Sequence, residues 1–168
     1  MNTEDTEERI CLFLYDSTSV SPVSSAVESF DMPALVRRIL ETVLYCDDLA
    51  RSAAFYQTLL TTTPMLTGDR LVALEAGEGT VLLLFQRGNS GALETAGGLV
   101  PGHDGGGPVH LAFAIEADAV AAWEARLAEM GIAIESRVRW DRGGQSIYFR
   151  DPEGRSVELA TPGLWPAY

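Results

Sequence analysis

A pattern of one strand, one helix and three further strands occurs twice in this chain, and it limits the fold more than any other feature of the sequence. The first copy covers residues 38–86 and the second covers residues 108–163. A single copy would form an open sheet with one unburied face, whereas two copies can curve together and shelter that face. The pattern therefore predicts an α+β fold: two βαβββ modules form a curved eight-stranded mixed sheet around a cavity, with the helices on the outside.

The repeat is visible in individual residues as well as in the pattern. Glu41 and His110 hold the same place in the first strand of each copy, 69 positions apart. Leu83 and Glu158 hold the same place in the last strand of each copy, 75 positions apart. These matching places indicate that the two modules are versions of one unit.

Hydrophobic periodicity and turn residues predict the elements of each copy. Asp48 is a suitable N-cap for the first helix, and Gly131 is a suitable C′ residue for the second helix. The first copy is expected to hold a helix at 49–60 and strands at 39–46, 65–67, 71–75 and 80–85. The second copy is expected to hold a helix at 117–130 and strands at 108–115, 132–139, 145–150 and 156–160.

The remaining segments predict how the chain is divided. Residues 1–31 are acidic and then rich in Ser, Thr and Val, which predicts a poorly ordered extension. Residues 32–168 are expected to form a single domain. Residues 87–107 are rich in glycine and are expected to be the linker between the two modules.

Charge and composition exclude several classes of function. The formal net charge is −12, and the chain contains arginine but no lysine. Such acidity argues against nucleic-acid and membrane partners, because both are bound largely through cationic side chains. The absence of lysine excludes a Schiff-base lysine, a P-loop lysine and a Ser–Lys pair. The acidic N-terminus and the lack of an apolar run of membrane-spanning length predict a cytoplasmic protein.

Three polar side chains are expected to point into the predicted cavity. Strand alternation places Glu41, His110 and Glu158 on the faces opposite the helices, where a core would have apolar residues. A buried carboxylate without a partner is costly. Two carboxylates and an imidazole that converge there are explained by a bound divalent cation or by a substrate. Tyr45 shares the face of Glu41 and is a candidate substrate contact.

Three segments of the sequence carry a family resemblance. Residues 39–56 are similar to an opening strand and helix, and residues 108–115 are similar to the start of a second module. Residues 148–159 are the most specific piece, because an Asp-Pro-Glu-Gly turn is followed by Val-Glu-Leu. Together these segments resemble the glyoxalase/bleomycin resistance/extradiol dioxygenase superfamily, which has the vicinal oxygen chelate fold. The resemblance covers about residues 38–163.

The resemblance implies that Glu41, His110 and Glu158 are metal ligands and that one of the two glutamates can act as a base. Enzymes of this family usually have a histidine at the place of Glu41. A fourth ligand position falls on Leu83, which cannot bind a metal. Oxygen and imidazole ligands of this kind suit Mn²⁺, Fe²⁺, Ni²⁺ or Zn²⁺ and leave coordination positions open for substrate oxygens.

Three further residues are candidates for the site. Ser146 and Tyr148 match positions that face the cavity in fosfomycin-resistance relatives, and they could contact substrate or could equally be packing residues. His103 lies in the loop before the second copy, where it could act as an acid or base at the cavity mouth. An exposed loop histidine with no such role is the simpler interpretation of His103.

Two main functions are consistent with these residues. The first is a metal-dependent enzyme of the lyase, isomerase or transferase type, acting on a small substrate with two adjacent oxygens. The lack of a second histidine ligand argues against an extradiol dioxygenase. The alternative is a metal-free protein that binds a small molecule or drug, as the bleomycin-resistance branch of the family does, and the net charge of −12 is compatible with a cationic ligand. Either protein is expected to be a homodimer.

Overall fold

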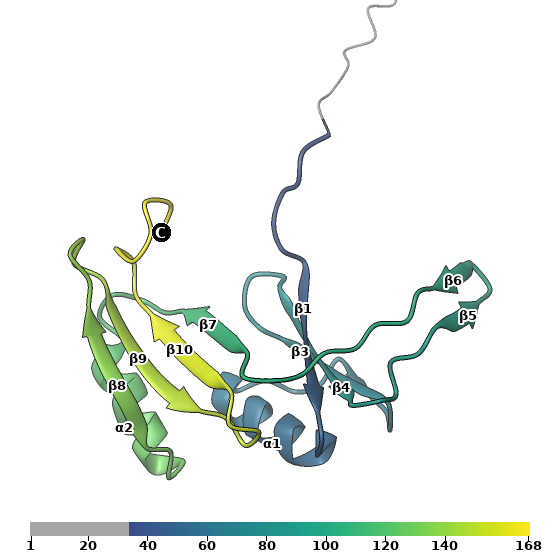
Figure 1. Ribbon diagram of the computed structural model, residues 1–168. Coiled ribbons are helices and arrows are strands. Elements are labelled where there is room, and N and C mark those ends of the chain that lie inside the picture. Colours follow the sequence, from purple (N-terminus) through teal and green to yellow (C-terminus); the bar gives the residue numbers. More distant parts are fainter. Residues whose placement is uncertain (1–33) are drawn as a thin grey trace, which may run out of the picture. The chain divides into compact units, whose positions relative to one another are not determined.

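The computed structural model describes residues 34–168, of which residues 37–168 form one compact unit. The predicted extension at 1–31 lies outside the described residues. The unit begins with β1 Glu41–Cys46, α1 Leu49–Leu60, β2 Leu66–Thr67, β3 Leu71–Glu75 and β4 Val81–Gln86, here called module one. It continues with β5 Leu93–Thr95 and β6 Gly98–Val100. Module two then consists of β7 His110–Ala114, α2 Val120–Glu129, β8 Ile134–Arg139, β9 Gln145–Arg150 and β10 Ser156–Ala160 (Figure 1).

The two modules have the same sheet topology. The strand order is β1-β4-β3-β2 in module one and β7-β10-β9-β8 in module two. In each sheet the first and last strands of the module pair in parallel, and the other neighbours are antiparallel. The predicted duplication and α+β class are confirmed. Hydrogen bonding divides the eight strands into two four-stranded sheets that are not closed into a barrel.

Local sequence signals account for the helix ends. The carboxylate of Asp48 accepts a hydrogen bond from the backbone N–H of Arg51, as expected of an N-cap. Gly131 follows α2 with a φ of 68°, the left-handed conformation that a C′ glycine adopts easily. Helix α2 begins at Val120, three residues later than predicted, and its N-cap Ala119 has no side chain that could cap it. None of the helices in residues 34–168 is both long and apolar enough to span a membrane.

Two glycines mark the duplication in the backbone itself. Gly79 and Gly154 each lie two residues before the last strand of a module, 75 positions apart. Their φ angles are 73° and 79°, in the left-handed region that favours glycine. The same backbone turn therefore introduces β4 and β10.

One hydrophobic core joins the two modules. Alternate residues of β1, such as Leu44 and Cys46, point to the helix side of the sheet and are buried, as predicted from the period of two. The helix-side residues of β10 in module two, Val157 and Leu159, are buried in the same cluster. Because the two modules share this core, the position of one sheet depends on the other.

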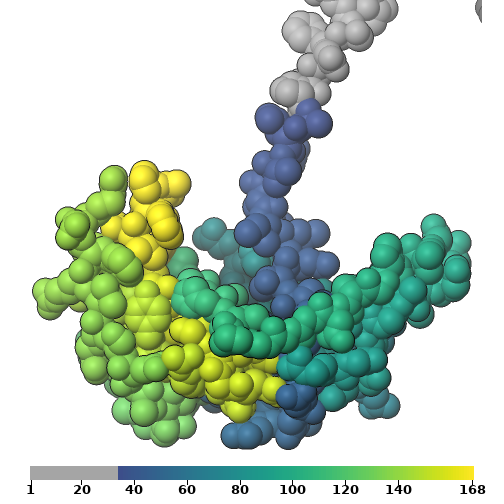
Figure 2. Space-filling view, in the orientation of Figure 1, coloured from purple at the N-terminus to yellow at the C-terminus, as the bar shows by residue number. Residues whose placement is uncertain are grey.

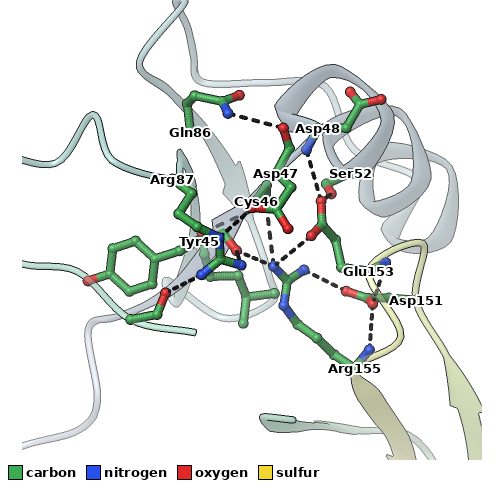
Figure 3. A network of polar contacts seen from close by, with 12 residues as sticks. Tyr45, Cys46, Asp47, Asp48, Ser52, Gln86, Arg87, Asp151, Glu153 and Arg155 are labelled. Carbon is green, nitrogen blue, oxygen red and sulfur yellow. Dashed lines mark hydrogen bonds and ion pairs between the residues drawn. The ribbon is translucent and has the colours of Figure 1, made fainter. Parts of the chain in front are cut away.

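A buried ion pair reinforces this contact between modules. The turn between β9 and β10 places Arg155 next to Asp151, with Nη1 and Oδ2 2.8 Å apart, and both side chains are almost completely buried (Figure 3). Arg155 also donates to the backbone carbonyl of Tyr45 at the end of β1. From α1, the hydroxyl of Tyr56 donates to Asp151 over 2.9 Å. The β9–β10 turn of module two is thus held against β1 and α1 of module one.

The electrostatics of this network favour its charged form. Burial acts to lower the pKa of Arg155, but the hydrogen bond and the charge of Asp151 outweigh burial and raise that pKa overall. Burial, followed by the charge of Asp151, raises the pKa of Tyr56, so the phenol stays protonated and donates. On the same turn, Glu153 accepts a hydrogen bond of 3.0 Å from the backbone N–H of Asp48.

The glycine-rich segment 87–107 contains a small hairpin that the sequence did not predict. Strands β5 and β6 pair antiparallel, and their residues are exposed on an arm that extends away from the two sheets (Figure 2). The returning chain is then fixed to module one, because Arg87 donates to the carbonyl of Gly105 over 2.6 Å and the backbones of Ser90 and His103 are hydrogen-bonded. This part of the linker therefore has a defined path.

Replacement of Arg155 tests whether the buried pair holds the modules together. Arg155→Met should lower the free energy of unfolding by about 3–5 kcal/mol, because it leaves the Asp151 carboxylate buried without its cation. The measurement is urea unfolding followed by circular dichroism. Arg150→Met is the matched control, since Arg150 precedes the same turn and its pair with Glu135 is exposed to water. Equal losses in the two variants would contradict the role given to Arg155.

Candidate functional site

The strand register brings several predicted residues together on one face of module two. We call this the site face: it is the side of the β7-β10-β9-β8 sheet opposite α2. Glu158 in β10 is the Cα partner of Tyr148 in β9 and of Ala112 in β7. His110 lies two residues before Ala112, so its side chain is on the same face. The predicted orientation of the His110 and Glu158 side chains is compatible with this register.

His110 and Glu158 are in direct contact. The Nε2 atom of His110 lies 3.1 Å from Oε2 of Glu158, and its Nδ1 atom lies 3.2 Å from the carbonyl oxygen of Ser156. A carbonyl oxygen only accepts, so Nδ1 carries a proton and donates it. A neutral ring would then direct the Nε2 lone pair at a carboxylate. A favourable contact requires either a proton between Nε2 and Oε2 or a cation bound to both side chains.

The carboxylate of Glu158 is buried and incompletely hydrogen-bonded within residues 34–168. The residue is only 4% exposed, and its Oε1 atom has no hydrogen-bond partner among residues 34–168. A buried carboxylate oxygen without a partner carries a large desolvation cost. The imidazole of His110 beside it is half-exposed, so the pair can be reached from solvent. An oxygen and an imidazole nitrogen in this environment form a donor set that fits a divalent metal.

Tyr148 and Ser146 extend the site face along β9. The ring of Tyr148 stacks with that of His110 at 6.1 Å between centroids. Burial, and then the neighbouring carboxylate of Glu158, raises the pKa of Tyr148, which keeps its hydroxyl protonated. Ser146 is buried, and its Oγ accepts a hydrogen bond of 2.7 Å from the indole Nε1 of Trp140.

Trp140 is a site residue that the sequence could not assign. It follows β8 at a position that continues the alternation of that strand, and this signal alone does not separate a packing role from a place in a site. The hydrogen bond to Ser146 shows that its ring lies at the end of the site face.

The other candidates form a second cluster on module one. The hydroxyl of Tyr45 is 2.7 Å from Nδ1 of His103, and the His103 ring meets Phe85 edge-on at 4.9 Å between centroids. Burial, followed by the negative charge of Asp104, raises the pKa of Tyr45. His103 is therefore fixed against module one. Glu41 is exposed at the start of β1 and shares the face of Tyr45.

The predicted three-residue ligand set is not assembled within one chain. In residues 34–168 no group of three His, Cys, Asp or Glu side chains is placed to hold a metal ion. The structure joins His110 to Glu158, whereas Glu41 belongs to the face of the other module.

Comparison with known proteins places this geometry in a family. The sequence profile of the Glyoxalase/Bleomycin resistance protein/Dioxygenase superfamily matches residues 38–159. Metallothiol transferase FosB of Shouchella clausii (strain KSM-K16) is 28% identical over 132 residues, which is 77% of this chain and 84% of that protein. Metallothiol transferase FosB of Bacillus licheniformis is 38% identical over 57 residues, so that match spans only 37% of that protein.

Solved structures agree with the sequence matches. Lactoylglutathione lyase from Agrobacterium tumefaciens is 34% identical with a TM-score of 0.70, covering 78% of this chain and 98% of that one. The fosfomycin resistance protein FosX from Listeria monocytogenes is 19% identical with a TM-score of 0.53, covering 79% of this chain and 97% of that one, and it shows a shared fold. The resemblance inferred from the sequence is thereby confirmed, and this chain belongs to the glyoxalase/bleomycin resistance protein/dioxygenase superfamily.

Proposed function

We propose that this protein is a divalent-metal-dependent enzyme of the lyase, isomerase or transferase type, acting on a small substrate with two adjacent oxygens. The observation that carries the proposal is the His110–Glu158 pair, because a buried carboxylate oxygen without a partner lies beside an imidazole. Relatives whose names are metallothiol transferase and lactoylglutathione lyase support a metal-dependent enzyme.

The proposed ligands are His110, Glu158 and Glu41. Because Glu41 does not join the other two within one chain, the third ligand would come from a second copy of the protein in a homodimer. Such a set suits Mn²⁺, Fe²⁺, Ni²⁺ or Zn²⁺. The bound metal would polarise the adjacent oxygens of the substrate.

The other residues of the site would act on the substrate directly. Tyr148 keeps its proton and can donate a hydrogen bond to a substrate oxygen near Glu158. Glu41 or Glu158 would serve as the base, and Ser146 would contribute a second polar contact. On module one, Tyr45 would contact substrate, and His103, whose Nδ1 lies 2.7 Å from the Tyr45 hydroxyl, would be a secondary candidate for the acid or base.

Metal uptake tests the proposal directly. Protein purified without chelator should contain about one transition metal ion per chain, and His110→Ala should lose at least tenfold in Zn²⁺ affinity because an imidazole ligand is removed. His103→Ala is the matched control, since it removes the only other histidine of the chain and should leave uptake unchanged. Metal content is measured by elemental analysis and affinity by calorimetry.

The same experiment separates the two main functions. Absence of metal, together with no thermal shift on adding Mn²⁺, Ni²⁺ or Zn²⁺, would refute the enzyme proposal and leave the metal-free binding protein. A drop in the thermal midpoint of His110→Ala in the absence of metal would identify a folding defect instead of a lost ligand.

Pairing of two copies can be tested by complementation. Light scattering should give the mass of a dimer. Neither Glu41→Ala nor His110→Ala should retain a complete site as a homodimer, but a mixed dimer of the two variants should bind one Zn²⁺ tightly, because one of its two sites keeps all three ligands. A monomeric mass, or mixed dimers that bind no better than the parents, would exclude a ligand contributed by the partner.

A further inference from the structure

The two modules differ at repeated positions that face away from the helices. In module one, Tyr45 and Phe85 are Cα partners across β1 and β4. At the same offsets of 69 and 75 positions, module two has Ala114 and Ala160, which are Cα partners across β7 and β10. Two aromatic side chains in one module therefore correspond to two alanines in the other.

The difference continues along the first strand of each module. Val43 of β1 corresponds to Ala112 of β7 by the same offset of 69 positions. Both Ala112 and Ala114 are exposed, so beyond His110 the site face carries only small side chains along β7. The fold itself does not demand small residues there, because the same strand pairing accommodates valine and tyrosine in module one.

Polar groups lie at both ends of this alanine strip. Beside Ala112 at one end is Glu158, which is more than nine-tenths buried and has an oxygen without a hydrogen-bond partner in the described part of the chain. At the other end is Ser146, the Cα partner of Ala160. Its Oγ accepts a hydrogen bond from the indole of Trp140, which places the Trp140 ring at that end of the strip. Because one carboxylate oxygen of Glu158 lacks a hydrogen-bond partner among the described residues, we infer that a ligand covers the strip.

The length of the strip sets the size of that ligand. Ala114 lies four positions after His110, which corresponds to roughly 13 Å along a β-strand. We propose that Ala112 and Ala114 form an open floor for the apolar part of an elongated substrate, whose adjacent oxygens lie at His110 and Glu158 and whose far end reaches the exposed ring of Trp140. This inference rests on the proposed function and names the substrate class: a small molecule with two vicinal oxygens and an unbranched or planar apolar body.

Two hydroxamic acids test the floor, because each presents two adjacent oxygens. Acetohydroxamic acid has a single methyl group, whereas hexanohydroxamic acid adds four methylene groups that would lie on the alanine strip. Zn²⁺-loaded protein should bind the longer probe at least tenfold more tightly in calorimetry, since each buried methylene favours binding. The longer probe should also change the tryptophan fluorescence, and Trp140→Phe should abolish that change.

Substitutions copied from module one supply the decisive variants. Ala114→Tyr places on β7 the residue that β1 carries at Tyr45, and it should reduce the preference for the longer probe to less than threefold while changing the affinity for acetohydroxamic acid less than twofold. Ala112→Val, copied from Val43, should give an intermediate preference. Thermal unfolding verifies that both variants fold. Equal affinities of the wild type for the two probes, or an unchanged preference in folded Ala114→Tyr, would overturn the inference.

Metal-free protein distinguishes failure of the floor from failure of the proposed function. If Zn²⁺ is not taken up but the longer probe still binds better and loses this preference in Ala114→Tyr, the metal proposal fails and the floor stands. If Zn²⁺ and acetohydroxamic acid bind but chain length has no effect, the floor fails and the metal proposal stands. Absence of binding of both probes to both forms would also refute the floor.

Discussion

The buried contact between Arg155 and Asp151 is the interaction on which the rest of the structure depends. Removing two charges from water is expensive, and it is tolerated only where each partner is fully engaged. Here Asp151 also accepts hydrogen bonds from Tyr56 and from the backbone of its own turn, while Arg155 donates to the end of β1. Displacement of the turn would leave a buried charge without a partner. The network therefore ties module two to the β1–α1 corner of module one in a single arrangement.

The position of the candidate site follows from this constraint. Strand β10 starts directly after Arg155, so anchoring the turn also fixes the register of β10 between β7 and β9. That register puts Glu158 beside His110 and Tyr148. Because β10 is an inner strand, the carboxylate of Glu158 is flanked on the same face by His110 of β7 and Tyr148 of β9. The buried Arg155–Asp151 pair thus supports the neighbouring His110–Glu158 pair, whose hydrogen bonding is incomplete. Functional sites are commonly held in place by rigid surrounding residues in this way.

Duplication gave the chain two equivalent faces, and the side chains on those faces have diverged. Module one fills its face with Tyr45, Phe85 and the docked His103. Module two has alanines at two of the equivalent positions and charged or polar groups at others. The backbone and the helix-side core of the two modules are alike, so folding does not require these differences. The differences instead determine what each face can bind or pack against.

The sequence by itself determined the elements of the two modules and their order, although it did not reveal the β5–β6 hairpin between them. These elements were predicted correctly from local or periodic signals, each of which depends on a few neighbouring residues. The signals are the alternation of β1 and β10, the Asp48 cap, the glycines at the turns and the matching offsets. The faces of His110 and Glu158 were also predictable, since strand alternation fixes them.

Tertiary structure alone decided which polar side chains meet. The His110–Glu158 contact, the Trp140–Ser146 hydrogen bond, the docking of His103 on Tyr45 and the separation of Glu41 within one chain all depend on how distant segments pack, and no pattern within a single segment specifies such contacts.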